Sequence, residues 1–139
     1  MGTRSLTRVF DDEDEVLCMY RQFDGYPSGH GAELADFLLP LKETNGISTY
    51  EHRKIFNGIG CLAAQIVAHF KTDVGGIYLL APGTKDAGQE YEYEIHSAGV
   101  GNSPMIRLFE KSYRAKKKPL TNLLYPAEFL AFIQQEKAA

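Results

Sequence analysis

The chain has 139 residues, of which 44% are hydrophobic and 24% are charged, proportions that are typical of a globular domain with a core of its own. The formal net charge of -3 argues against a protein that binds duplex nucleic acid, because such binding normally requires a basic face over much of the domain. No run approaches the ~20 apolar residues that a membrane-spanning helix needs. We therefore expect a single domain over residues 1–139 that resides in the cytoplasm and has no membrane partner.

The two cysteines, Cys18 and Cys61, lie far apart in apolar runs and form no Cys-x-x-Cys pair. This pattern predicts buried free thiols in a reducing compartment. The histidines lack the His-Glu-x-x-His and Cys/His spacings of zinc sites. We expect neither a metal nor a cofactor.

Two apolar stretches near the N-terminus flank an acidic cluster. Residues 4–10 alternate between large apolar and polar side chains, residues 16–21 form a second apolar run, and residues 11–15 between them are all acidic. This order predicts a β-hairpin with an acidic tip. A calcium loop would need spaced ligands and a glycine for its turn, so a solvated tip is the better interpretation.

A glycine-rich stretch at residues 20–31 follows the hairpin and precedes a helix. The helix is indicated by the helical spacing of Leu34, Phe37 and Leu38, and Pro40 ends it. Glycines allow a backbone to approach a ligand closely, and a helix that begins just after the loop would direct free N–H groups toward an anion. The alternative is a tight connection between strand and helix, in which glycine and proline serve only as turn residues.

We expect this stretch to form the ligand site. In it, Arg21 pairs with an anionic group, the backbone around Ser28 holds phosphate, and two tyrosines stack on a base. Among the histidines, His30 has the most suggestive surroundings for acid–base chemistry on a phosphate ester. The expected ligand-binding residues are Tyr20, Arg21, Asp24, Tyr26, Ser28, Gly29, His30 and Gly31. We assign no catalytic residue, because no complete catalytic motif accompanies them.

The longest helix is expected in the middle of the chain. Residues 48–51 form a Ser-x-x-Glu capping box, and apolar residues recur at helical spacing from Ile55 to Phe70. A face of small residues predicts close packing of this helix on the sheet. That face consists of Gly58, Gly60, Ala63 and Ala64. A second interpretation is that Asn57-Gly58 breaks the helix and forms another glycine loop.

The second half of the chain has strand patterns before a last helix. The strands are expected at residues 77–80, 90–95 and 105–110, and the helix begins at Pro126. In the strand at 90–95, glutamate alternates strictly with tyrosine and isoleucine, which predicts a half-buried strand whose carboxylates face solvent. The basic run at residues 111–118 is either a solvated loop or a source of positive charge at the rim of a ligand pocket.

The order of these elements is ββααβββα, and the links on both sides of the helical pair have hairpin lengths. The sequence therefore predicts an α+β fold, with an antiparallel sheet of about five strands and helices packed on one face. No internal repeat or linker divides the chain.

Five segments carry a resemblance to a known group of proteins. They are residues 1–7 (Met-Gly-Thr-Arg-Ser-Leu-Thr), 19–22, 24–31, 56–61 and 75–79. In these segments the chain resembles small uncharacterised proteins from tailed phages and bacterial genomes. By analogy with other small phage proteins, the resemblance implies an anti-defence role, in which the protein sequesters a nucleotide immune signal in the host cytoplasm.

Three functions remain open. The first is a non-catalytic binding protein for an anionic nucleotide-like small molecule, either monomeric or a homo-oligomer. The second is a small phosphoesterase or nucleotide hydrolase that uses His30. The third is a protein-interaction module that inhibits a host enzyme through the acidic hairpin tip and a strand edge.

Overall fold

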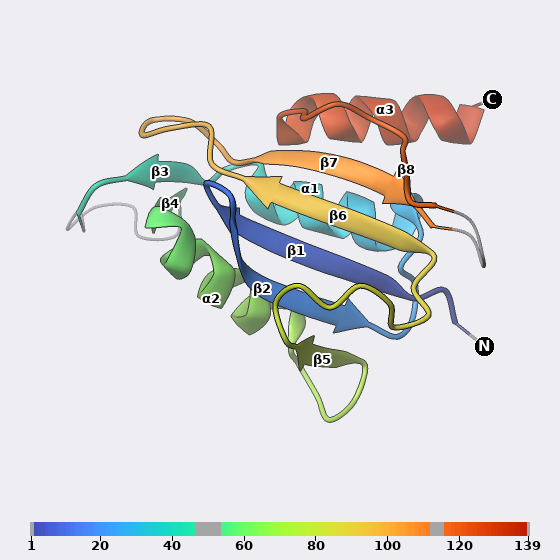
Figure 1. Ribbon diagram of the computed structural model, residues 1–139. Helices are drawn as coiled ribbons and strands as arrows, with labels where there is room; N and C mark the ends of the chain where they lie inside the picture. Colours follow the sequence, from blue (N-terminus) through green and yellow to red (C-terminus); the bar gives the residue numbers. More distant parts are fainter. Residues whose placement is uncertain (1, 47–53, 112–115, 139) are drawn as a thin grey trace.

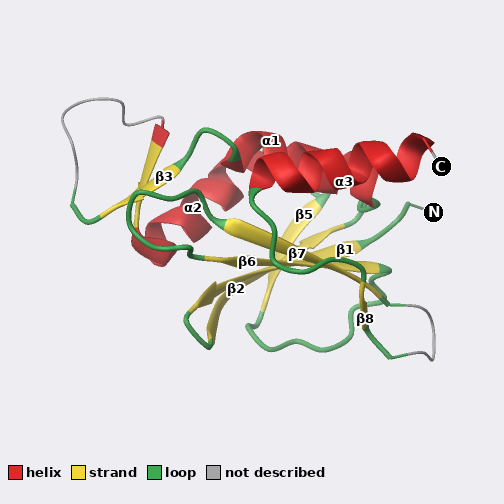
Figure 2. Cartoon of the chain, turned by 90° about the horizontal axis from the view of Figure 1, so that it is seen from above, coloured by secondary structure: helices red, strands yellow, loops and turns green. Residues whose placement is uncertain are grey.

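The computed structural model describes residues 2–46, 54–111 and 116–138. These residues form an α+β fold, as predicted, in which three helices cover one face of a sheet (Figure 1, Figure 2). The helices are α1 (Ala32–Leu38), α2 (Gly58–Phe70) and α3 (Pro126–Ala138), and a π-helical turn, Pro27–Gly31, precedes α1. The strands are β1 (Ser5–Asp11), β2 (Asp14–Arg21), β3 (Lys42–Thr44), β4 (Ile55–Asn57), β5 (Ile77–Leu80), β6 (Tyr91–His96), β7 (Met105–Glu110) and β8 (Lys118–Pro119).

The main sheet has six strands in the order β5-β2-β1-β6-β7-β8, and β3 and β4 form a separate parallel pair. The prediction of an antiparallel sheet is wrong. The sheet is mixed, because β1 pairs with β6 in parallel. The physical reason lies in segment 81–90. It does not form a hairpin, since β5 pairs with β2 and β6 pairs with β1, so the segment must cross the sheet between them. Figure 1 shows it passing in front of β2 and β1, on the face away from α1.

The core lies between the sheet and the three helices. Strand alternation directs Met19 and Tyr93 to the helix side, and both are fully buried. Leu34, Leu62 and Phe129 reach this core from α1, α2 and α3, and each has 0% exposure. A fully buried side chain of this size contributes about 1.5–3 kcal/mol through removal of apolar surface from water. The helical faces that the sequence predicted around these three residues are confirmed.

The other face of the sheet carries a buried ionic network. Glu92 is 1% exposed, and its Oε1 accepts hydrogen bonds from Arg8 Nε (2.7 Å) and Lys117 Nζ (3.2 Å). Gln89 Nε2 donates to the other carboxylate oxygen (2.9 Å). Burial raises the pKa of Glu92, but the hydrogen bonds from Arg8 and Gln89 together with the positive charges of Arg8 and Lys117 outweigh burial, so the net shift of this pKa is downward. The prediction that the glutamates of this strand face solvent is therefore wrong for Glu92.

Helix α2 begins later than predicted, at Gly58. Residues 55–57 form β4, and Gly58 has φ +78°, a conformation that glycine adopts readily and that turns the chain from strand into helix. The helix is thus interrupted at Asn57 and Gly58, as in the alternative interpretation, but these two residues join β4 directly to α2 and do not form another glycine loop. The two glycines of the small-residue face do not pack closely, because a Cβ at Gly58 or Gly60 would have no neighbour within 4 Å outside the helix, whereas Ala63 of the same face is buried in the core. The predicted capping box at residues 48–51 lies outside the described residues.

Both cysteines are free thiols, as predicted, but only Cys18 is buried. Burial raises the pKa of Cys18 to about 11, so this thiol stays protonated at neutral pH. The prediction that Cys61 is buried is wrong, because α2 turns Leu62 to the core and leaves Cys61 in contact with solvent. No helix within the described ranges is long and apolar enough to cross a membrane.

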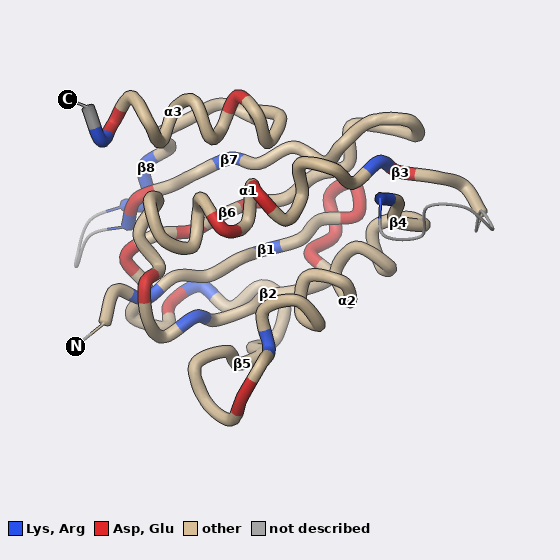
Figure 3. Tube along the Cα trace, turned by 180° about the vertical axis from the view of Figure 1, so that it is seen from behind, with Lys and Arg blue, Asp and Glu red and all other residues tan. Residues whose placement is uncertain are grey.

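The hairpin between β1 and β2 carries the predicted acidic tip. Residues 11–14 are exposed, and Figure 3 shows acidic residues gathered at this turn. Glu15 differs from them because it turns inward. Its Oε2 lies 3.1 Å from Arg8 Nη1 and accepts a hydrogen bond from the Gly83 amide (2.9 Å). The hairpin is therefore attached to the crossing segment 81–90 at its base, while its tip remains solvated.

Candidate functional site

The glycine-rich stretch connects β2 to α1 in a closely packed turn. Gly25 donates its N–H to Thr3 O (2.9 Å), and a Cβ at Gly25 would lie 2.8 Å from the Cβ of Ser5. A Cβ at Gly29 would lie 2.6 Å from Asp24 O. Such contacts are too close for real side chains, so packing within the protein already requires glycine at both positions. These contacts favour the interpretation of the stretch as a tight connection.

The amide groups at the start of the helical turn are already used. Gly29 N donates to Tyr26 O (2.9 Å), and His30 N donates to Asp24 O (2.8 Å). An anion at this loop would have to compete with these two internal hydrogen bonds. Ser28 is exposed beside them. The predicted phosphate cradle therefore offers fewer free donors than the sequence suggested.

His30 is fully buried beneath this loop. Arg21 Nη1 lies 3.0 Å from His30 Nδ1, and Thr7 Oγ1 lies 2.7 Å from His30 Nε2. A guanidinium only donates hydrogen bonds, so Nδ1 must be the unprotonated nitrogen of a neutral imidazole. Nε2 then carries the proton and donates a hydrogen bond to Thr7 Oγ1. Both ring nitrogens are thus engaged inside the protein.

The neutral state of His30 has two physical causes. Desolvation by burial lowers its pKa, and the positive charge of Arg21 lowers it further, to about 3. The imidazole also packs against Phe70 and Tyr93, with ring-centroid distances of 4.9 Å and 5.1 Å. His30 therefore orients Arg21 and has no free nitrogen for acid–base chemistry on a ligand.

Arg21, the last residue of β2, is the charged group that this arrangement holds in place. Its Nε donates to Phe23 O (2.7 Å), and its Nη1 donates to His30 Nδ1 and to Glu33 Oε2 (2.5 Å). The guanidinium carbon lies 6.0 Å from the centre of the Phe70 ring. Nη2 has no hydrogen-bond partner in the part of the chain that the structure describes. Since a guanidinium has five N–H groups, the two on Nη2 remain for a ligand.

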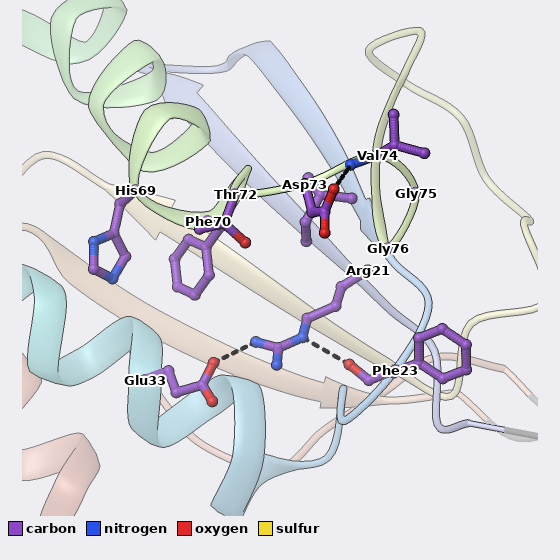
Figure 4. Close-up of a pocket in the computed structure, with 11 residues that line it drawn as sticks. Arg21, Phe23, Glu33, His69, Phe70, Thr72, Asp73, Val74, Gly75 and Gly76 are labelled. Atoms are coloured by element: carbon purple, nitrogen blue, oxygen red, sulfur yellow. Dashed lines mark hydrogen bonds and ion pairs between the residues drawn. The ribbon is translucent and has the colours of Figure 1, made fainter.

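A cleft with a volume of about 520 Å³ opens beside Arg21, and we call it the Arg21 cleft (Figure 4). Its walls are Phe23 from the loop after β2, Glu33 from α1, His69 and Phe70 from the end of α2, and the segment 72–77. This volume lies within the range of small-molecule sites.

A sharp turn between α2 and β5 forms one side of the Arg21 cleft. Gly75 and Gly76 have φ +77° and +75°, which reverses the chain within a few residues. Lys71 Nζ donates to Gly75 O (3.1 Å) and Ile77 O (2.9 Å) and so holds both ends of the turn. The ammonium group of Lys71 is therefore directed to main-chain carbonyls.

Of the eight residues expected in the ligand site, Arg21 lines the cleft and the others do not. Tyr20 is adjacent to Arg21 in β2 but points to the opposite face of the sheet, where its ring centroid lies 6.0 Å from that of Tyr78. The Tyr26 hydroxyl donates to Asp24 Oδ1 (3.3 Å) at the surface. The structure does not bring Tyr20 and Tyr26 together for stacking on one base.

Several residues of the Arg21 cleft were not expected from the sequence. Phe70 has the spacing of a core residue, and Glu33 has that of a solvent-exposed residue on a short helix. One signal was available at residues 72–76, because a Thr-Asp pair shortly before two glycines is typical of an exposed, tightly turned segment. It does not by itself indicate a ligand.

The described part of the basic run lies away from the Arg21 cleft. Lys117 Nζ is 3.2 Å from Glu92 Oε1 and 3.4 Å from Glu94 Oε2, on the opposite face of the sheet. It also lies 4.3 Å from the centre of the Phe109 ring. Residues 112–115 of this run are outside the described residues.

Comparisons with known proteins give no match: no family model matches the chain, and no curated protein or solved structure does. The function must therefore be inferred from the geometry of the Arg21 cleft.

Proposed function

We propose that the protein is a non-catalytic binding protein for a small anionic, nucleotide-like ligand, and that this ligand binds in the Arg21 cleft. The observation that carries the proposal is that the Arg21 side chain is held in place but keeps free hydrogen-bond donors. Its side chain is only 15% exposed and is held by three hydrogen bonds, while Nη2 remains without a partner among the described residues. A partly buried, oriented guanidinium with free N–H groups at the edge of a cleft is suited to bind a phosphate or carboxylate oxygen.

In the proposed complex, the acidic group of the ligand binds the free N–H groups of Arg21 Nη2 and takes the place of Glu33 on Nη1. The Glu33 side chain is 51% exposed, and an exposed ion pair of this kind contributes about 1 kcal/mol or less. The replacement of Glu33 by the acidic group of the ligand therefore costs little free energy. Because Arg21 is already oriented by His30 and by Phe23 O, binding requires little further ordering of the side chain. The Phe70 ring provides an apolar wall on which a base can stack.

Sequestration without turnover agrees with the position of His30. This residue was the candidate for acid–base chemistry in the hydrolase alternative. It is buried, and it holds Arg21 with one ring nitrogen and Thr7 with the other. We therefore propose that the ligand is bound and released unchanged.

The proposal can be tested by isothermal titration calorimetry with nucleoside monophosphates and 3′,5′-cyclic mononucleotides. Arg21→Lys keeps the charge but loses the planar set of donors, so we expect it to weaken binding by about tenfold or more. Glu33→Gln removes the internal competitor for Arg21, so we expect it to tighten binding. Glu136→Gln, an exposed substitution on α3, is the control for loss of one negative charge. The proposal is wrong if no member of the panel binds, or if Arg21→Lys binds as tightly as the parent protein.

A further inference from the structure

The charges and acceptors of the Arg21 cleft restrict the class of ligand. We infer that the ligand is a monoanion whose aromatic base carries an amino group, with the acidic group bound by Arg21 and the amino group bound by Asp73. This inference rests on the proposed function, because it assumes that the Arg21 cleft is the binding site. It goes further by specifying both the charge of the ligand and the hydrogen-bonding edge of its base.

The first step concerns charge. Within the cleft, Arg21 is accompanied by two carboxylates, Glu33 and Asp73. The neighbouring Lys71 keeps its positive charge but does not line the cleft, and its Nζ is directed to the carbonyl oxygens of Gly75 and Ile77. A single phosphodiester or carboxylate group can be neutralised by Arg21. A triphosphate would place uncompensated negative charge beside the two carboxylates, and these like charges repel, more strongly once the bound ligand excludes water from between them.

The second step concerns Asp73. Its Oδ1 accepts a hydrogen bond from the Val74 amide (2.7 Å), which fixes the side chain, and its Oδ2 has no partner in the described ranges. Figure 4 shows Asp73 and Glu33 on opposite sides of Arg21, with the Asp73 carboxylate directed into the cleft. An ionised carboxylate only accepts hydrogen bonds. The group that complements it on a ligand is therefore an N–H donor, such as the exocyclic amine of a base.

The third step concerns the shape of the ligand. Phe70 and His69 line the cleft together, with ring centroids 4.9 Å apart. His69 is stacked on Phe37 at 4.2 Å, which holds this aromatic wall in place. The two rings are nearly perpendicular (88°), so a flat ring can stack on the face of one of them and meets the edge of the other. A planar base between Asp73 and Arg21 is thus compatible with both polar groups and with the wall.

Calorimetry with three matched compounds tests the inference. The first is 3′,5′-cyclic AMP, a monoanion with an amino group. The second is the 3′,5′-cyclic monophosphate of purine riboside, which lacks only the amino group, and the third is ATP, which keeps the base but carries an open 5′-triphosphate of higher charge in place of the cyclic phosphodiester. We expect cyclic AMP to bind about tenfold or more tightly than either of the others, because the second leaves Asp73 unpaired and the third is repelled.

Two variants assign the preference to Asp73. In Asp73→Asn the amide would keep its oxygen on the Val74 N–H and present its NH₂ group to the cleft, so we expect both preferences to shrink to about threefold or less. Asp36→Asn, an exposed residue of α1 outside the cleft, should keep both preferences. If the three compounds bind equally, or ATP binds most tightly, and Arg21→Lys weakens them all, the inference is wrong and the proposed function stands. If none of the three binds in an Arg21-dependent manner, both are contradicted.

Discussion

Arg21 Nη1 and His30 Nδ1 lie 3.0 Å apart and join the end of β2 to the helical turn before α1. The direction of this hydrogen bond fixes the chemistry of both residues. Because the guanidinium can only donate, the imidazole must be neutral and accept. The residue that the sequence indicates for acid–base chemistry is therefore a support for the residue that can bind a ligand.

The burial of His30 beside the positive charge of Arg21 makes the stability of the protein depend on pH. The pKa of His30 is lowered from 6.5 to about 3 in the folded state, so between these two values the unfolded chain binds a proton that the native protein does not. Stability is then fully present above pH 6.5 and falls as the pH drops toward 3, with a slope of up to about 1.4 kcal/mol per pH unit. Urea unfolding between pH 7 and pH 5 should show this loss.

Two variants isolate the contribution of His30 to this slope. In His30→Asn the side-chain oxygen can still accept from Arg21 but cannot titrate, so the loss of stability between neutral and mildly acidic pH should become smaller. Ser28→Asn, an exposed substitution in the same loop that adds no group that titrates in this range, should leave the slope as it is. An unchanged slope in His30→Asn would show that His30 is not the titrating group.

Two glycines of α2 should respond in opposite directions to alanine. Gly58 has φ +78°, which costs an L-residue about 1–2 kcal/mol, so we expect Gly58→Ala to destabilise the protein by about that amount. Gly60 is helical and has open space around it, so Gly60→Ala should stabilise the protein by about 0.5–1 kcal/mol. Thermal or urea unfolding of the two variants measures this difference. A loss of stability in Gly60→Ala would indicate a close contact that the structure does not contain.

Arg8 and Lys117, the two cations of the ionic network around Glu92, should contribute unequally to the free energy of unfolding. Arg8→Met would leave the buried carboxylate of Glu92 with weaker compensation, and breaking a buried pair in this way costs about 3–5 kcal/mol. Lys117 is 34% exposed and makes longer contacts, so Lys117→Met should cost about 1 kcal/mol or less. Urea unfolding at neutral pH compares the two variants. Equal costs would mean that burial does not distinguish these two cations.

Leu62→Ala should destabilise the protein by about 2–5 kcal/mol, because the side chain has 0% exposure and its removal leaves a cavity between α2 and the sheet. Cys61→Ala is a suitable control, since the adjacent residue is exposed and should change the free energy of unfolding by about 0.5 kcal/mol or less. Denaturant unfolding of both variants measures the effect. A near-neutral Leu62→Ala would contradict the assignment of this helix face to the core.

Local sequence patterns were sufficient to predict the helices and strands whose packing partners are near in sequence. The alternating residues before and after the acidic cluster form the β1–β2 hairpin, and the helical spacing around Phe129 gives α3. The crossing segment 81–90 could not be predicted in this way, because its glycines and proline are equally typical of a hairpin. Its path depends on which distant strands pair, and no local pattern specifies that choice.

For the same reason, only part of the candidate site could be predicted from the sequence. Arg21 is marked locally, since it is a basic residue at the end of a strand beside a glycine-rich loop. Asp73 and Glu33 carry no such mark, because the Arg21 cleft is assembled from three separate segments. The burial of Glu92 also escaped prediction, since an alternating strand looks the same whether its polar face meets water or an arginine that lies far away in the sequence.

The most direct test of the central claim is to locate the bound ligand by NMR chemical-shift mapping with 3′,5′-cyclic AMP. If the ligand binds in the Arg21 cleft, the largest changes should occur at the Arg21 side-chain Nε–H and at the amides of residues 72–77, and the changes at these amides should be lost in Arg21→Lys. Changes at the amides of Ser28 and Gly29 should be smaller, because that loop lies outside the cleft. Changes centred on residues 28–31, or no changes around Arg21 under saturating ligand, would contradict the claim.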